Sequence, residues 1–309
     1  MSLLEVKKGK LNLKNPILTA SGTFGYGDEF EPFFDVSLLG GITIKGTTLN
    51  PKDGNPPPRI YEVYGGMLNS IGLANIGINQ VIEKYSKYFL SLINSGCAVI
   101  ININGEKIED FLKIIEISDS TGCFNFYEIN VSCPNVKKGG IAFSQDPKTM
   151  GKLINKIRKK TKTPIIVKLS PNVQSISPYV KSAEDSGADI ISLINTMKGI
   201  SIDINSKKPR FKNIYAGFSG PAIKPIALYH IYEARRSTCL PIIGMGGINN
   251  FNDMLEFFAV GADAIEVGTM NLVNPTITYE LLIELEKYCE NNKKPLSKIK
   301  EELTQWMKQ

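Results

Sequence analysis

The sequence predicts an α/β fold: a single (β/α)8 TIM barrel over residues 1–309, with a short N-terminal hairpin and long loops at the C-terminal face. Three observations predict it. Eight short runs of apolar, mostly β-branched residues recur along the chain. Most of these runs are apolar at consecutive positions, which is typical of parallel strands buried on both faces. Amphipathic stretches with a period near 3.6 residues separate them, and eight strands alternating with helices can close into a barrel.

The expected elements follow one another in regular alternation. In chain order the strands span residues 17–20, 41–44, 98–103, 126–131, 165–169, 189–194, 242–245 and 264–267. The helices span residues 76–94, 106–118, 148–160, 177–186, 225–236, 250–259 and 276–290. Asp146 before Pro147 is typical of an N-cap followed by a proline at the first helical position. Gly187 and Gly261 each follow a helix and precede a strand, as glycines that terminate helices do.

The two ends and three long connections complete the expected barrel. Residues 3–13 are expected to form a hairpin that closes the bottom of the barrel, and residues 295–309 a final helix. The connections 46–75, 132–145 and 196–219 are longer than most loops of compact domains, and such loops usually carry function. Each leaves the carboxyl end of a strand, where barrel active sites lie.

Composition argues against several classes of protein. With 42% apolar and 21% charged residues, the chain is typical of a folded domain and not of a disordered or collagen-like one. Its apolar runs are far shorter than a membrane span, and its first residues lack the apolar core of a secretory signal. The net charge of +6 suits anionic ligands but is too diffuse to indicate nucleic acid. The basic run at 207–212 is interpreted as a solvated loop.

Cysteine and histidine usage narrows the chemistry. The five cysteines are odd in number and form no C-x-x-C pair, which argues against a disulfide framework or a zinc site and favours a reducing cytoplasm. Cys97, Cys123, Cys239 and Cys289 are expected to be small buried packing residues. His230, the only histidine, lies in an expected helix as a surface or packing residue. Ser-His-Asp catalysis and multi-histidine metal sites are therefore disfavoured.

Polar residues and glycines follow nearly every expected strand. In chain order they are Ser21, Lys45, Asn102, Asn130 with Cys133, Lys168, Asn195, Gly246 with Gly247, and Gly268 with Thr269. The carboxyl ends of the strands meet at one mouth, where buried amines and amides need partners. Glycine lets backbone N–H groups approach a phosphate, and the loops after the last two strands form the common phosphate site of such barrels. These glycines therefore favour a phosphate site over tight turns alone.

The side chains at the mouth suggest a planar ligand. An ammonium such as that of Lys168 is costly there unless it faces an anion or an electron-rich ring, such as a flavin. Schiff-base chemistry and a buried ion pair are the alternatives. The amides of Asn69, Asn130 and Asn195 complement a cyclic imide or amide, although each alone is typical of a turn. Cys133 is a candidate general base, since a thiol pKa of about 8.5 can be tuned downward.

Seven motifs occur in one order along residues 15–275. They are LTASGTFGYG at 18–27, NSIGL at 69–73, EINVSCPNV at 128–136, VKLSPN at 167–172, SLINT at 192–196, FSGPAIKP at 218–225 and IGMGGI at 243–248. In these motifs the chain resembles the class 1 dihydroorotate dehydrogenases. The resemblance implies an FMN-dependent oxidation of dihydroorotate to orotate, a step of pyrimidine (UMP) biosynthesis.

The resemblance also implies roles for individual residues. It implies that FMN is held by Ser21, Lys45, Gly46, Asn102, Asn130, Lys168, Ile194, Gly220, Gly246, Gly247, Gly268 and Thr269. It implies that dihydroorotate is held by Lys45, Asn69, Ser70, Ile71, Gly72, Leu73, Asn130, Asn195 and Thr196. Cys133 would remove the C5 proton while the C6 hydride passes to the flavin, without a metal. The flavin carries the redox chemistry, and the protein supplies position and charge.

The segment 136–143 resembles the 1B subtype of this family. That subtype implies a homodimer of barrels joined to an iron–sulfur FAD subunit in a heterotetramer, with NAD as the electron acceptor. The 1A subtype, of similar fold, uses fumarate instead. The chain departs from the family pattern at Ser144 and at the stretch ANIG of residues 74–77, and both departures concern loop geometry.

Three other functions are compatible with the same residues. The first is another FMN barrel acting on a pyrimidine, such as a dihydropyrimidine dehydrogenase domain or a dihydrouridine synthase; the latter would need a basic RNA-binding module, which the sequence lacks. The second is a flavin-free, phosphate-binding isomerase or aldolase acting through Lys168. The third is a non-catalytic binding subunit, against which Cys133 in its loop argues. The colour of the purified protein distinguishes a flavoenzyme from the flavin-free alternatives.

Overall fold

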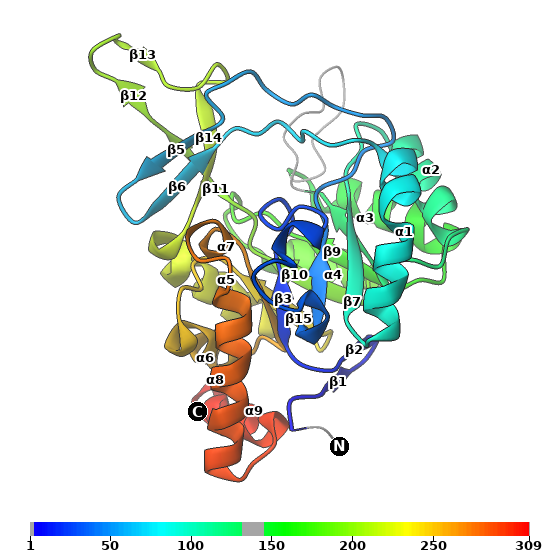
Figure 1. Cartoon of the computed structure of the whole chain (residues 1–309), viewed down its shortest axis with the longest axis vertical. Coiled ribbons are helices and arrows are strands. Elements are labelled where there is room, and N and C mark those ends of the chain that lie inside the picture. Colours follow the sequence, from blue (N-terminus) through cyan, green and yellow to red (C-terminus); the bar gives the residue numbers. More distant parts are fainter. Residues whose placement is uncertain (1–2, 132–144, 309) are drawn as a thin grey trace.

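A closed barrel of eight parallel strands forms the centre of the molecule. The computed structural model describes residues 3–131 and 145–308. The strands are β3 Ile17–Thr19, β4 Gly41–Thr43, β7 Ala98–Ile103, β8 Phe126–Asn130, β9 Ile165–Lys168, β10 Ile190–Leu193, β15 Ile242–Met245 and β16 Ala264–Val267. They lie around the barrel in chain order, and β16 pairs with β3 to close it (Figure 1). The predicted (β/α)8 barrel is confirmed.

The barrel strands are buried along their whole length. All six residues of β7 are buried, and its neighbours β4 and β8 pair with it in parallel register. Continuous apolar runs are the pattern that such doubly covered strands require. The expected strands 98–103, 242–245 and 264–267 match the observed bounds, and each of the other five differs by one residue at one or both ends. The residues trimmed from the carboxyl ends remain buried, and the amides of Ala20, Ile44, Leu169 and Ile194 still donate to carbonyls of the neighbouring strands.

Helices follow the strands and cover the outside of the barrel. They are α1 Ile78–Asn94, α2 Ile108–Asp119, α3 Pro147–Lys160, α4 Ser177–Asp185, α5 Lys224–Arg235, α6 Phe251–Ala259, α7 Met270–Val273 and α8 Ile277–Asn292, with short 3-10 turns η1 Asp28–Phe30, η2 Val36–Leu38 and η3 Pro221–Ile223. All seven expected helices are present. The Asp146 side chain accepts hydrogen bonds from the first-turn amides of Lys148 and Thr149, as its N-cap position predicts. Gly187 and Gly261 follow α4 and α6 with φ of 98° and 101°, which glycine adopts without strain.

A hairpin and a C-terminal helix close the bottom of the barrel. The hairpin consists of β1 Val6–Lys8 and β2 Leu11–Leu13, and the expected final helix is α9 Leu296–Leu303 followed by η4 Gln305–Lys308. The Leu11 side chain is fully buried in the main hydrophobic core. The amide of Leu296 donates to the carbonyl of Leu3, which ties the helix to the start of the hairpin. Both terminal segments therefore pack at the bottom of the barrel.

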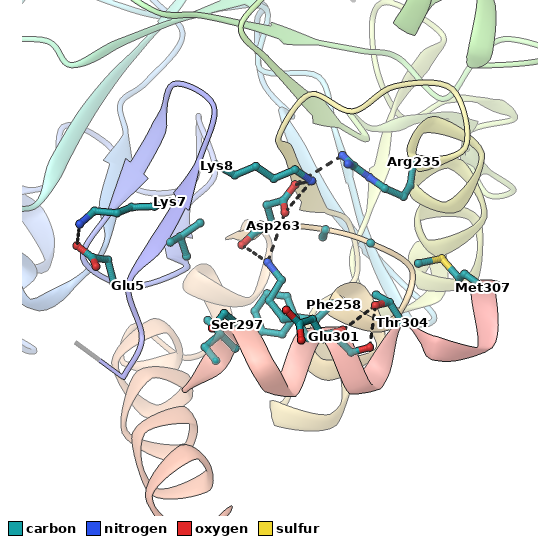
Figure 2. A pocket seen from close by; sticks show the side chains of 15 residues that line it. Glu5, Lys7, Lys8, Arg235, Phe258, Asp263, Ser297, Glu301, Thr304 and Met307 are labelled. Carbon is teal, nitrogen blue, oxygen red and sulfur yellow. Dashed lines mark hydrogen bonds and ion pairs between the residues drawn. The ribbon is translucent and has the colours of Figure 1, made fainter. Parts of the chain in front are cut away.

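Four charged residues meet where these segments contact the barrel, and we call them the base-rich cluster: Lys8, Arg235, Asp263 and Lys300. Asp263 precedes β16 and lies 3.1 Å from Lys8, 3.6 Å from Arg235 and 3.6 Å from Lys300 (Figure 2). Lys300 also donates to the Asp263 carbonyl at 2.8 Å. The cluster borders a pocket of about 460 Å³ between the hairpin, α5 and α9. One carboxylate thus joins three cations from three elements to the bottom of the barrel.

Two of the three long connections contain strands that the sequence analysis missed. Strands β5 Ile60–Val63, β6 Gly66–Asn69, β11 Met197–Ile200 and β14 Tyr215–Ser219 form one antiparallel sheet in the order β11-β14-β6-β5. A small hairpin, β12 Ile202–Asp203 with β13 Lys208–Pro209, extends from it. Figure 1 shows this sheet standing above the mouth of the barrel. The expectation that 46–75 and 196–219 are plain loops is therefore wrong.

The added sheet has its own small core. Leu68, Phe211 and Ala216 are buried together, and Tyr61 and Phe218 pack against them. Residues of β5 alternate between exposed and half-buried positions, so no continuous apolar run marks the strand in the sequence. The central pairing joins β6 to β14, about 150 residues further along the chain, with Asn69 opposite Gly217. Because the paired strands lie so far apart in the chain, no local sequence pattern predicts that they pair.

The remaining expectations about single residues are mostly confirmed. Cys97, Cys123 and Cys289 are buried, but Cys239 is exposed because it lies in the turn between α5 and β15, so its expected packing role is wrong. His230 is buried in α5, and burial lowers its pKa, which fits a packing residue. Among residues 3–131 and 145–308, none of the helices combines the length and apolar character that crossing a bilayer requires.

Candidate active site

The polar residues expected at the strand ends do lie there. Asn102, Asn130 and Lys168 are on β7, β8 and β9, with Asn130 and Lys168 as the last residues of their strands. The others follow their strands directly or within three residues; they are Ser21, Lys45, Gly46, Ile194, Asn195, Gly246, Gly247, Gly268 and Thr269. Since all eight strands run the same way around a closed barrel, these positions share one mouth. This placement is a condition of the predicted roles and does not test the roles themselves.

Lys168 is held by two buried glutamates that the sequence analysis did not assign. Its Nζ lies 3.3 Å from Glu128 Oε1 and 3.7 Å from Glu266 Oε2. The side chains of both glutamates are fully buried, and that of Lys168 is 4% exposed. The ammonium also donates to Ser21 Oγ at 3.2 Å, which links it to the loop after β3. We call Glu128, Lys168 and Glu266 the acid-rich cluster.

Glu128 has the environment of a carboxylate. Asn102 Nδ2 donates to its Oε1 at 2.5 Å and Ser192 Oγ to its Oε2 at 2.8 Å, in addition to the Lys168 ammonium. Several donors directed at one carboxyl group stabilise its charged form. Asn104, a buried residue that the sequence analysis did not single out, donates to Asn102 Oδ1 at 2.7 Å and so orients that amide.

Glu266 has fewer donors. Thr43 Oγ1 donates to its Oε1 at 3.0 Å, while its Oε2 is buried and accepts no hydrogen bond from the described residues. Burial, with repulsion from Glu128, raises the pKa of Glu266 from its ordinary value of 4.5 to about 8. Burial alone would lower the pKa of Lys168, but Glu128 and Glu266 outweigh it and the pKa of the lysine is raised. At neutral pH the cluster therefore contains an ammonium, a carboxylate and a neutral carboxyl group.

A signal for these glutamates does exist in the sequence. Each is the only charged residue in an otherwise apolar run, FYEIN for β8 and AIEV for β16. A charge inside such a run faces the barrel interior or its helical layer, and either environment requires a partner. Lys168, the only charged residue of β9, is that partner.

The glycine loops after the last two strands meet a third loop. Thr269 Oγ1 donates to Ser219 Oγ at 2.9 Å, which brings the Gly268–Thr269 turn next to Gly220. Gly247, with φ of 87°, is so close to α5 that an added Cβ would lie 2.7 Å from the Lys224 amide nitrogen. Gly246 has φ of 119°, so both positions favour glycine. The residues predicted to bind a phosphate thus lie next to one another, and most of them are glycines that present backbone and no side chain.

The predicted substrate amides also converge. Asn195 Nδ2 donates to Asn130 Oδ1 at 3.5 Å, and Asn195 Oδ1 accepts from the Thr196 amide at 2.7 Å. Asn69 Nδ2 donates to the carbonyl of Gly217 at 3.2 Å, and a Cβ at Gly217 would lie 2.4 Å from Thr196 Oγ1. The added sheet therefore brings Asn69 next to Gly217, which lies beside Thr196 in the loop after β10. The sequence analysis grouped these residues but had no geometric reason for including Asn69.

The segment Ser70–Leu73 lies in the connection between this sheet and α1. Asn55 donates to the carbonyl of Ser70 at 3.0 Å, and Ser70 donates its amide to the carbonyl of Arg59 at 2.7 Å. Ile71 accepts from the amide of Asn55, and a Cβ at Gly72 would lie 2.6 Å from Asn55 atoms. Leu73 is left-handed, with φ of 58°, a conformation that is strained for a side chain of this size. The segment is held in one conformation from both ends.

Comparison with known proteins decides the family. Residues 3–288 match the family model described as dihydroorotate dehydrogenase. The chain belongs to this family. A relative from Thermoanaerobacter pseudethanolicus is 51% identical over 289 residues, covering 94% of each chain, and one from Desulforamulus reducens is 46% identical with the same coverage. A third, from Caldicellulosiruptor bescii, is 44% identical over 96% of this chain and 97% of its own. All three are named dihydroorotate dehydrogenase B (NAD(+)), catalytic subunit.

Membership of the dihydroorotate dehydrogenase family makes the chain an oxidoreductase and confirms the resemblance seen in the motifs. It favours the ion-pair and flavin interpretations of Lys168 over a Schiff base. The structure agrees, because an amine held between two carboxyl groups stays protonated and is a poor nucleophile. No cluster of three or more metal-ligating side chains occurs in the described part of the chain.

Two parts of the predicted site are not described in the same detail. Cys133 and Ser144 lie outside the described residues. The role of Cys133 as the general base and the effect of Ser144 on its loop therefore stay predictions. The other departure, at 74–77, is ordered by Asn75, which donates to Thr48 Oγ1 and accepts from the Gly77 amide, both at 2.9 Å. Lys45 borders a pocket of about 570 Å³ beside this stretch.

Proposed function

We propose that the chain catalyses the oxidation of dihydroorotate to orotate with FMN as the hydride acceptor. One observation carries the proposal: an ammonium fixed by two buried carboxyl groups at the mouth of a barrel, next to converging amides, in a member of the dihydroorotate dehydrogenase family. A fixed positive charge stabilises the negative charge that a hydride brings to an acceptor. The same reaction is a step of pyrimidine synthesis.

The residues present fit an FMN molecule. Its phosphate suits the glycine loops at Gly220, Gly246, Gly247 and Gly268, because glycine lets backbone N–H groups approach an anion closely. Thr269 adds a hydroxyl group, and the wall beneath is apolar at the buried Ile194. Ser21, Lys45, Gly46, Asn102, Asn130 and Lys168 would hold the flavin ring. When bound, FMN supplies the hydride acceptor; the chain supplies orientation and charge.

The amides would orient the substrate. Dihydroorotate carries a cyclic imide, whose alternating donors and acceptors match Asn69, Asn130 and Asn195. Thr196, Lys45 and the segment Ser70–Leu73 would complete its contacts, with the Lys45 ammonium suited to the carboxylate. Holding the ring between the amides and the flavin places its C6 hydrogen for transfer and lowers the entropic part of the barrier.

Proton removal is proposed to fall to Cys133. A carbon-bound proton needs a positioned base, and the thiolate of Cys133 would take the proton from C5 as the hydride leaves C6. His230 is distant from this task, since it is buried in α5. Removing both hydrogens from adjacent carbons leaves the C5–C6 double bond of orotate.

The electron acceptor and partner are part of the proposal. The three relatives named above are catalytic subunits of an NAD-linked enzyme, and the segment 136–143 resembles the 1B subtype. We infer a homodimer of this chain joined to an iron–sulfur FAD subunit in a heterotetramer. The proposal includes a cytoplasmic location, which the unpaired cysteines support. No nucleic acid takes part.

The test is anaerobic mixing of the purified, FMN-loaded chain with dihydroorotate while the flavin absorbance is followed. Rapid bleaching is expected. Cys133→Ala should still bind FMN and orotate but lose about 10²–10⁴-fold in the bleaching rate, the usual range for a lost general base. Cys133→Ser should retain part of the rate, rising with pH. Cys239→Ala, at an exposed cysteine far along the chain, is the matched control and should behave as wild type.

Three outcomes would contradict parts of the proposal. A colourless chain that cannot be loaded with FMN would favour a flavin-free isomerase or aldolase. Bleaching by another reduced pyrimidine in preference to dihydroorotate would indicate a different flavin barrel. Efficient turnover of fumarate by the isolated chain, without a partner, would identify the 1A subtype; the 1B proposal expects NAD reduction only when the iron–sulfur flavoprotein is added.

A further inference from the structure

Glu266 is a buried ionisable group that the proposed reaction does not use. It lies on β16 inside the barrel with a fully buried side chain, 3.7 Å from the Lys168 ammonium. Its contacts come from different strands: Thr43 on β4 donates to Oε1, and Lys168 on β9 faces Oε2. An ionised carboxylate at this place would have one oxygen without a hydrogen bond in a dry interior, which is costly.

The charges around Glu266 can be counted completely within the described residues. The ionisable groups that act on it are Glu128 and Lys168, from β8 and β9. The residues opposite it on the neighbouring strands β15 and β3 are uncharged, Met245 and Leu18. Glu128 accepts three hydrogen bonds and balances Lys168 as a carboxylate. A second full negative charge would exceed what one ammonium can offset, so Glu266 keeps its proton.

Hydride transfer changes this balance. A hydride carries two electrons and one proton, so its arrival at the acceptor adds one negative charge next to Lys168. The cluster that faces this charge should be neutral or positive for the transfer to be favourable. With Glu266 protonated, the acid-rich cluster has no net charge; with Glu266 ionised, its net charge is −1 and opposes reduction.

We propose that Glu266 is a positioning residue for the reaction: its neutral carboxyl group holds the Lys168 ammonium at the barrel mouth, and its proton keeps the cluster from opposing the charge that hydride transfer adds. The inference rests on the proposed function, because it requires a flavin beside Lys168. Glu266 acts through Lys168, and no contact with the substrate is implied.

The test follows the reduction potential of bound FMN as a function of pH. In the wild type, reduction should draw an additional proton onto Glu266 near pH 8, so the potential should fall more steeply with pH there than on either side. Glu266→Gln, which imitates the neutral carboxyl group and cannot ionise, should lose this steeper region. Glu233→Gln is the matched control, since Glu233 lies on α5, outside the barrel strands, and its Oε1 accepts hydrogen bonds from Ser175 and Ile176; it should keep the steeper region.

A second variant covers the case in which Glu266→Gln does not fold. Glu128→Gln removes the negative neighbour that contributes to keeping Glu266 protonated, so the steeper region should move to lower pH by at least one unit. A purely structural role for either glutamate would change expression or melting temperature but would not move this region. The unfolding free energy of the FMN-free chain gives a readout without the cofactor: Glu266→Gln should remove its decline between pH 5 and pH 8.

The outcomes separate this inference from the proposed function. A chain that binds no FMN overturns the proposed function and, with it, this inference. A chain that binds FMN and is bleached by dihydroorotate, yet shows the same pH dependence in wild type and Glu266→Gln, overturns the inference alone. A steeper region that stays in place in Glu128→Gln also overturns it, because the proton would then belong to another group.

Discussion

One strand carries two buried charge clusters of opposite composition. At its amino end, Asp263 receives three cations in the base-rich cluster; three residues later, Glu266 shares one cation with Glu128 in the acid-rich cluster. The base-rich cluster joins β1, α5 and α9, all peripheral elements, to the barrel (Figure 2). The acid-rich cluster joins only barrel strands and faces the mouth. We expect the first arrangement to serve assembly of the fold and, under the proposed function, the second to serve the chemistry.

The two clusters manage surplus charge in different ways. The cations at the bottom are on long side chains whose ends also reach carbonyl groups, such as Lys300 to Asp263 and Arg235 to Leu240, and 16% of each side chain stays exposed. The glutamates at the mouth are short, rigidly placed on strands and fully buried. They have no route to water, so surplus charge is removed by keeping a proton. Lys8, 36% exposed, can reach solvent, whereas a carboxyl group on a barrel strand changes its protonation instead.

The largest expected effect breaks the base-rich cluster. Asp263→Asn leaves three cations facing one another without a carboxylate, and it also weakens the bond from the Ile242 amide to Asp263 Oδ2. Breaking a buried ion pair by removing one partner costs about 3–5 kcal/mol of unfolding free energy, and we expect the lower end because Lys8 is 36% exposed. Denaturation in urea measures it. A loss below about 1 kcal/mol would show that the cluster contributes little to assembly.

The next effect concerns the acid-rich cluster and should appear in activity. Lys168→Ala removes the charge that faces the flavin, so the rate of flavin reduction by dihydroorotate should fall at least tenfold, about 1.4 kcal/mol in the barrier. Stopped-flow absorbance measures the rate in the FMN-loaded chain. Glu266 is already neutral at pH 6, so one carboxyl group at most is left without its cation, and the loss of stability should be smaller than in Asp263→Asn. A variant with bound FMN and an undiminished rate would contradict the role of Lys168.

The clusters should also give the stability opposite pH dependences. Glu266 has a pKa raised from 4.5 to about 8, so between these values the folded chain binds more protons than the unfolded chain and stability falls as pH rises. Burial, opposed by Asp263 and supported by Lys8, lowers the pKa of Lys300 from 10.5 to about 8. Between about 8 and 10.5 the unfolded chain binds more protons through this lysine, so its contribution to stability rises with pH.

We call the fall in unfolding free energy below about pH 8 the acidic limb and the rise above it the alkaline limb. Each limb should have a slope of at most about 1.4 kcal/mol per pH unit, the value for one proton. Urea denaturation at intervals from pH 5 to pH 10 measures both limbs, with Glu266→Gln expected to flatten the acidic limb and Lys300→Met the alkaline one. If Lys300→Met flattened the acidic limb instead, the assignment of the two protons would be reversed.

The smallest effect is a control within one helix. Lys298 and Lys300 are two residues apart on α9, but Lys298 forms an exposed pair with Glu301, whereas Lys300 reaches into the base-rich cluster. Lys298→Ala should leave both the stability and its pH dependence unchanged, because exposed pairs contribute little. Circular dichroism melts of the two variants at pH 7 and pH 9.5 compare them. An effect of Lys298→Ala equal to that of Lys300→Met would mean that helix propensity, and not the buried charge, is responsible.

The sequence predicted which residues lie at the barrel mouth better than it predicted the residues that hold them in place. Lys168, Asn102 and the glycines after β15 and β16 were expected at the mouth because each follows a recognisable strand. Glu128 and Glu266 were not expected, because a single charged residue in an apolar run does not say which way it faces or what meets it. Asn69 was assigned by resemblance, and its link to Gly217 depends on a strand pairing about 150 residues apart.

The sequence by itself determined the barrel, its eight strands and the ends of the seven expected barrel helices to within two residues, because apolar periodicity, caps and terminal glycines act over a few residues. Only the tertiary structure decided the sheet above the mouth, the exposure of Cys239 and the two charge clusters. The physical reason is the range of the interactions. Local patterns determine which elements form, but the protonation of Glu266 and the partners of Asp263 depend on distances and burial between segments that meet only in the folded chain.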